Sequence, residues 1–260
     1  MRTEVGGVAV ISKMVKILDA VSDCDHVNVA QVSERVHMPR TTVFRILNTL
    51  VAEGVLTKEY RPHARLLMWA HSALQSMDLR EASAPFLESL LQRYEETASV
   101  YVRVGETRIC LDRREGLNLL RHMIVIGQPM PLHAGSAGRI LMAWLDEQTR
   151  EDLLQQSRER FPTIHSSDSP DWDAIQRQGW SMSRGERDPA LASISVPIFT
   201  SRTEDEPRVE GALSISGALQ RFTRMNIEEV AQELKSCALS ITTRMTGADF
   251  KSVSEQSSRI

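Results

Sequence analysis

The chain has 260 residues, of which 42% are hydrophobic and 25% are charged, which is typical of a soluble protein with one large or two ordinary domains. The net charge of −3 gives no sign of a nucleic-acid partner for the molecule as a whole. Residues 35–65 differ, because six arginines and lysines stand there against only Glu53 and Glu59, a net charge of +4. A basic segment ahead of an acidic remainder favours a DNA-binding module joined to a regulatory domain.

The cysteines and the apolar runs indicate the compartment. Cys24, Cys110 and Cys237 are odd in number and far apart, so no disulfide framework is expected and a reducing cytoplasm fits. No signal-peptide pattern and no apolar run of about 18 residues is present, so we expect no membrane partner. Histidine, cysteine and acidic residues show no metal-ligand spacing, and we expect neither a metal nor another cofactor.

Three helices are expected in the first 54 residues. The first covers 11–21, and the second covers 29–36 with Asn28 as its N-cap. The third begins at Pro39, whose φ suits a first turn, and ends at Gly54, which tolerates a left-handed cap. Apolar residues at helical spacing form their inner faces: Ile11, Val15, Leu18 and Val21; Val29, Val32 and Val36; Val43, Ile46, Leu47 and Leu50.

The segment VLTKEYRPHARLLMW, residues 55–69, has two apolar runs around a basic turn and predicts a hairpin. Helix, short helix, tight turn, helix and hairpin together indicate a winged helix-turn-helix. The third helix would enter the major groove, and the basic turn, with Arg65 behind it, would lie on the DNA backbone. An ordinary three-helix bundle with a solvated polar face is the alternative. The residues expected to contact DNA are Arg40, Thr41, Thr42, Arg45, Asn48, Lys58 and Arg61.

Residues 69–98 have a helical pattern that Pro85 divides, so we expect a second helical segment to start at Pro85. The expected organisation is therefore a winged helix-turn-helix at 8–68, a linker helix at 69–84, a larger domain at 85–247 and a disordered tail at 248–260.

The larger domain is expected to be α+β, because hairpins alternate with grouped helices. A two-residue turn at Gly105-Glu106 joins the first two strands, and Gly179 ends a short helix. Further strands are expected at 118–126, 180–183, 192–199 and 208–217, and helices at 139–145, 146–157, 172–178 and 225–245.

The stretch MPLHAGSAGR, residues 130–139, brings a nearly bare backbone to a helix start. Two explanations stay open. Another element packs closely there, or a small anion meets the free N–H groups and the helix dipole.

Two pairs of serines support a binding pocket. Ser193 and Ser195 are two residues apart in one strand, as are Ser214 and Ser216 in another, so each pair shares a face. Such polar groups suit a pocket for a small polar molecule, and the alternative is that they face solvent.

Nothing in the sequence indicates catalysis. The GxSxG pattern is absent around Ser136 and Ser216, and the GSAG stretch lacks dinucleotide-binding spacing. His133 is expected to be structural, and Glu186 with Asp188 to lie in a solvated turn. We therefore expect that the protein is not an enzyme.

Over roughly residues 8–245, the chain resembles the isocitrate-lyase-regulator (IclR) family of bacterial transcription factors. The matching segments are MPRTTVFRILNTLVAEGVL, GQPMPLHAGSAGRILMAWL, GWSMSRGERDPALASISVPIF and GALSISG, in the family's order. The resemblance implies a C-terminal effector domain with a GAF/PAS-like curved antiparallel sheet and no catalysis. It also implies homodimers through the N-terminal module, or dimers of dimers, on a pseudopalindromic operator in double-stranded DNA.

The resemblance further implies a small organic acid as effector, with a change in DNA binding transmitted through the helix at 71–84. The effector-binding residues carried over by motif are Leu119, Ser136, Ala137, Ser183, Leu191, Ser193, Ser214 and Ser216. Three positions depart from the family's usual residues: cysteine is frequent at the position of Ser193, an acidic residue occurs at that of Ser183, and glycine is common at that of Ala190. The segment EYRPHARLLM replaces the usual wing. The rival interpretation is a carboxylate-binding enzyme or sensor whose N-terminal bundle only contacts proteins.

Overall fold

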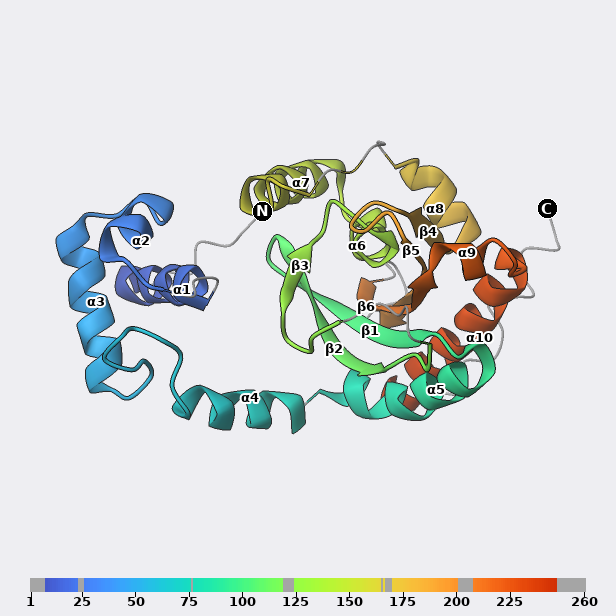
Figure 1. Cartoon of the computed structure of the whole chain (residues 1–260), viewed down its shortest axis with the longest axis horizontal. Coiled ribbons are helices and arrows are strands. Elements are labelled where there is room, and N and C mark those ends of the chain that lie inside the picture. The colour runs from blue at the N-terminus through green and yellow to red at the C-terminus, as the bar shows by residue number, and fades with distance from the viewer. Residues whose placement is uncertain are drawn as a thin grey trace. The chain divides into compact units, whose positions relative to one another are not determined.

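A computed structural model describes residues 8–22, 26–75, 77–118, 124–164, 166, 170–200 and 208–246 (Figure 1). The chain forms two compact units, Met1–Ser76 and Met77–Ile260. The boundary therefore falls inside the expected linker at 69–84. The expected tail at 248–260 lies outside the described residues.

The first unit is built on three helices, α1 (Ala9–Ser22), α2 (Val29–Arg35) and α3 (Arg40–Ala52). The Asn28 side chain caps α2 by accepting the Ala30 N–H at 2.8 Å, as predicted. Gly54 has the expected positive φ, and the N–H groups of the two residues that follow it bond back to the Leu50 carbonyl. The core they enclose contains Ile17, Ala20, Val21, Val32, Val43, Leu47, Leu50, Val55 and Leu56.

The predicted inner face of the first helix was partly wrong. Val21 is buried and Leu18 is half-buried, but Ile11 and Val15 are exposed because Ile17 and Ala20 face α2 and α3 instead. An apolar strip on α1 is therefore left uncovered within the first unit.

The predicted hairpin was also wrong in extent. Only a single bridge, Leu56 with Pro62, closes a short wing, and α4 (Arg65–Gln75) begins directly after it. Pro62 has no N–H to extend a ladder, and RLLMWAHSALQ carries its apolar residues at helical rather than alternating spacing.

The helical pattern that follows breaks at a different place from the one predicted. Helix α5 (Asp78–Tyr94) contains Pro85 in its interior, so no helix starts there. The Glu81 carbonyl loses its partner at Pro85, but both residues are exposed and water can hydrate that oxygen.

The second unit is an α+β domain on one curled antiparallel sheet, which confirms the predicted class. Its six strands run in the order β3-β2-β1-β6-β5-β4. The hairpin turn at Gly105-Glu106 is confirmed by the pairing of Val104 with Thr107. The bounds are β1 Thr97–Val104, β2 Thr107–Arg114, β3 Pro129–Pro131, β4 Ser181–Arg184, β5 Leu191–Thr200 and β6 Arg208–Ala218.

The strand predicted at 118–126 does not form in its described part. Residues 119–123 lie outside the described residues, and Ile126 makes only an isolated bridge with Cys110. The short β3 follows instead.

Helices cover both faces of the sheet. Helix α6 (Ser136–Ala143) lies inside the curl against β5 and β6, and α5 with α10 (Ile227–Thr246) covers the other face (Figure 1). The remaining helices are α7 (Glu147–Arg160), α8 (Trp172–Gln178), which Gly179 ends as predicted, and α9 (Leu219–Phe222). The curl and α6 together enclose the space in which the predicted serines lie.

Candidate functional site

In the first unit, α3 presents a polar face to solvent. Arg40, Thr41, Arg45 and Asn48 are exposed and Thr42 is half-buried, while Val43, Leu47 and Leu50 are buried on the opposite side. Arg45 lies near the middle of the outward face, since it is about half a turn from the buried stripe. The structure therefore leaves the predicted residues of α3 available for contact.

The short wing places Lys58 and Arg61 in solvent beside this face. Tyr60 connects the wing to α3, because its hydroxyl donates to Asn48 Oδ1 at 3.1 Å. Asn48 therefore has a second role that the sequence pattern did not show. Phe44 was also missed: its side chain is 51% exposed on the edge of the polar face, where an aromatic ring can contact a thymine methyl group.

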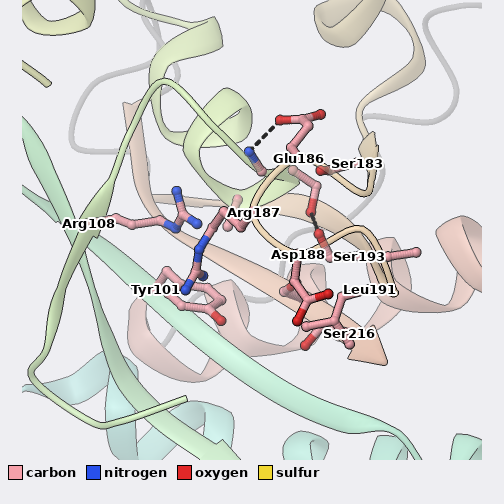
Figure 2. Close-up of a pocket in the computed structure, with 14 residues that line it drawn as sticks. Tyr101, Arg108, Ser183, Glu186, Arg187, Asp188, Leu191, Ser193 and Ser216 are labelled. Atoms are coloured by element: carbon pink, nitrogen blue, oxygen red, sulfur yellow. Dashed lines mark hydrogen bonds between the residues drawn. The ribbon is translucent and has the colours of Figure 1, made fainter. Parts of the chain in front are cut away.

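In the second unit, one pocket gathers residues from α6, β4, β5, β6 and the sheet's other half (Figure 2). It is lined by seven of the eight residues that the sequence nominated; Leu119 lies outside the described residues. The seven are Ser136, Ala137, Ser183, Leu191, Ser193, Ser214 and Ser216. The pocket is small, with a cavity volume of about 40 Å³.

Hydroxyl groups form two rows across four neighbouring strands on the α6 side of the sheet. Directly opposed residues of antiparallel strands share a face, so strand register defines each row. One row is Ser181, Ser195, Ser214 and Ser99, and the other is Ser183, Ser193, Ser216 and Thr97. We call these the serine rows. All eight groups are buried except Ser193, which is half-buried, so the solvent-facing alternative is wrong for them.

Ser136 at the start of α6 joins both rows through a directed chain of hydrogen bonds. Ser214 donates to the Ile194 carbonyl at 3.1 Å and Ser195 donates to Ser214 at 2.9 Å. Each hydroxyl has one proton, so Ser136 must donate to Ser195 and accept from Ser193, both at 2.7 Å. The lone pairs of Ser193 are therefore left to face the pocket.

The small-residue turn before α6 is explained first by close packing. A Cβ at Gly138 would overlap the Leu132 carbonyl oxygen and would lie 2.9 Å from Arg108 Nη1. Gly135 has a φ of +89° and donates its N–H to Glu186 Oε2 at 2.7 Å. A carboxylate of the protein itself thus occupies the amide of the N-cap residue just before α6, so this amide is not open to a ligand.

Replacing Gly138 with alanine should destabilise the second unit, although glycine to alanine in a helix normally stabilises by up to about 1 kcal/mol. The added methyl group meets backbone that cannot rotate away, so we expect a loss of at least about 1 kcal/mol in urea unfolding. Gly105→Ala measures backbone strain alone for comparison, because Gly105 has positive φ but nothing within 4 Å of its Cβ. A G138A protein as stable as the wild type would contradict the packing.

The wall opposite the serine rows carries two arginines that sequence reasoning missed. Arg108 of β2 is buried, and Arg187 from the loop after β4 is half-buried (Figure 2). The Arg108 guanidinium lies 5.6 Å from the centroid of the Tyr101 ring. Burial, and then the charge of Arg187, lower the pKa of Arg108 to about 10, and burial raises that of Tyr101 to about 12. The sequence contained one signal for Arg108: alternation in TRICL, residues 107–111, places Arg108 and Cys110 on the same face of the strand.

Two neighbouring groups have structural roles. His133 is held by Ser157 Oγ and the Ile164 carbonyl, each at 3.0 Å, as the structural interpretation expected. The solvated-turn interpretation of Glu186 was wrong, because its carboxylate pairs with Arg139 as well as with the Gly135 N–H. Among the described residues, no group of three metal-ligating side chains is found, and no helix is long and apolar enough to cross a membrane.

Comparisons with known proteins agree with this arrangement. The family described as "IclR helix-turn-helix domain" matches residues 10–59, and "Bacterial transcriptional regulator IclR C-terminal" matches residues 71–243. The regulator KdgR of Dickeya chrysanthemi is 26% identical over 94% of this chain and 82% of its own length.

Two solved structures show the same fold. An IclR family regulator from Brucella abortus has a TM-score of 0.74 at 19% identity, covering 93% of this chain and 94% of its own. An IclR homolog from Microbacterium hydrocarbonoxydans, complexed with 4-hydroxybenzoate, has a TM-score of 0.64 at 22% identity, covering 92% and 100%.

Proposed function

This chain belongs to the IclR family of bacterial transcriptional regulators, with a helix-turn-helix DNA-binding domain and a C-terminal effector domain, and we propose that its effector is a small organic acid. The observation that carries the proposal is the pocket itself. Polar hydroxyls line one side of it and guanidinium groups line the other, which suits a ligand with both a hydroxyl or oxo group and an acid group.

The size of the pocket favours a short acid. Its cavity volume is only about 40 Å³, so a short acid needs less movement of side chains than an aromatic acid such as the 4-hydroxybenzoate of the Microbacterium homolog. The acceptor lone pairs of Ser193 favour a hydroxyl donor on the ligand.

For the DNA-binding half, we propose that α3 reads the major groove and that Lys58 and Arg61 of the wing hold the flanking phosphates. The uncovered apolar residues of α1 and α4 support a dimer formed through this unit. They are Val8, Ile11, Val15, Leu67, Met68 and Trp69, all about half or more exposed. A two-fold dimer would require a pseudopalindromic operator, and such a regulator would work in the bacterial cytoplasm.

Replacing Ser214 with valine should abolish the response to the effector and spare DNA binding. The change removes the acceptor of the Ser195 proton and so disrupts the chain that orients Ser136 and Ser193. We would screen the full-length protein by thermal shift against a library of organic acids, then titrate the best acid into a gel shift with DNA from the chain's own upstream region.

Ser236→Val, at an exposed position of α10, is the matched control and should behave as the wild type. If S214V kept both the thermal shift and the altered DNA binding, the pocket would not be the effector site. Turnover of the acid, with no salt-dependent DNA binding, would favour the enzyme alternative instead.

A further inference from the structure

We propose that Arg108 is the residue that holds the effector's carboxylate and determines the preference for acids over neutral molecules. The inference rests on the proposed function of the pocket and assigns it a direction: a charged end at Arg108 and Tyr101, and a hydroxyl end at the serine rows. Figure 2 shows these two ends, with Arg108, Arg187 and Tyr101 on one side and Ser193, Leu191 and Ser216 on the other.

Arg108 is buried and forms no ion pair with a described residue, and Glu186 acts on its charge only from beyond 4.0 Å. Arg108 is only 3% exposed. Its Nη1 donates hydrogen bonds to two neutral acceptors, the carbonyl of Pro131 and, at 2.6 Å, the carbonyl of Ala134. Its Nε has no hydrogen-bond partner, and no described carboxylate lies within 4.0 Å of it. A buried cation of this kind is costly unless an anion joins it.

The acidic groups beside the pocket are engaged elsewhere. Glu186 is held by Arg139 and by the Gly135 N–H, and Asp188 Oδ1 accepts the Ala190 N–H at 2.8 Å. Arg187 adds a second positive charge on the same wall, with its Nη1 3.3 Å from Met130 Sδ. With Arg139, three arginines stand here beside only two carboxylates, Glu186 and Asp188, so this wall carries one excess positive charge.

The amide of the N-cap residue before α6 does not compete for that anion, because Glu186 already accepts the Gly135 N–H. Arg108 instead lies against the bare backbone there: a Cβ at Gly135 would be 3.0 Å from Arg108 Nη2. The small residues of the turn thus make room for a guanidinium, whose planar fork suits a carboxylate.

The test compares acids with their neutral amides on the full-length protein. Pyruvate and L-lactate are titrated beside pyruvamide and L-lactamide by calorimetry, with wild type, R108M, R108K and S214V. We expect the wild type to bind the acids roughly tenfold or more tightly than the amides, a ratio that falls to within about threefold in R108M. R108K keeps the positive charge and should therefore retain part of the acid-to-amide affinity ratio. It replaces R108M in the test if R108M does not fold.

Ser214→Val should weaken acid and amide alike, because it acts at the hydroxyl end. An undiminished acid-to-amide ratio in R108M, or in R108K if only that variant folds, would overturn the role of Arg108 while leaving the pocket as the effector site. A wild type that binds none of the four compounds would instead count against both this inference and the proposed short acid.

Discussion

Replacing Arg221 with alanine is expected to lower the free energy of unfolding of the second unit by about 3–5 kcal/mol. Arg221 in α9 holds the carboxylate of Glu96 with two hydrogen bonds, one from Nε and one from Nη2 at 2.8 Å. The Glu96 side chain is 0% exposed, and these bonds raise the pKa of Arg221. Without the guanidinium, a buried negative charge would be left with no partner of opposite sign.

Urea unfolding followed by linear extrapolation measures the loss. Arg224→Ala is the matched control, because this arginine is exposed two positions after α9 ends and makes no ion pair with a described residue; its effect should stay within about 0.5 kcal/mol. Adding Glu96→Gln to R221A should restore part of the stability, since an amide carries no charge. A cost of R221A no larger than that of R224A would mean that water reaches Glu96.

Replacing Arg45 with alanine is expected to weaken operator binding by about 1–3 kcal/mol and to relax the preference at one base pair. Arg45 lies near the centre of the outward face of α3, and it borders a groove that Val10, Ile11 and Met14 of α1 also line.

Gel-shift titrations at several salt concentrations separate the two kinds of contact. A base contact should lower affinity mainly for the operator, whereas a phosphate contact should weaken all sequences and reduce the salt slope by about 1. Arg177→Ala, on an exposed position of α8 in the other unit, should change neither. An R45A protein with unchanged operator affinity and base preference would mean that Arg45 does not contact a base.

The sequence predicted helices and strands well where it contained a clear helix cap or a clear side-chain periodicity. Asn28, Gly54 and Gly179 set helix ends where the structure has them, and the spacing of Ser193 and Ser195 gave their common face. Pro85 misled, because the exposed face of a helix tolerates a proline when water replaces the lost hydrogen bond.

What could not be predicted depends on contacts between distant segments. Arg108 meets the Pro131 and Ala134 carbonyls only because β2 pairs with β3, and Glu186 reaches Gly135 across 51 positions of sequence. A single sequence shows that Arg108 shares a face with apolar neighbours, but it does not show which groups complete that environment. The small-residue turn was ambiguous for the same reason, since both packing and anion binding call for glycine.

The serine rows have a consequence for how this sensor could diversify. A hydroxyl proton turns about its C–O bond at little cost, so the same oxygen can offer a hydrogen to a ketone or take one from an alcohol. Three of the eight groups, Ser193, Ser195 and Ser214, are linked through Ser136 in a hydrogen-bonded chain whose polarity is set by proton order rather than by backbone position. Replacing a single serine of the serine rows with cysteine, threonine or aspartate would then change which effector binds while the sheet keeps its shape.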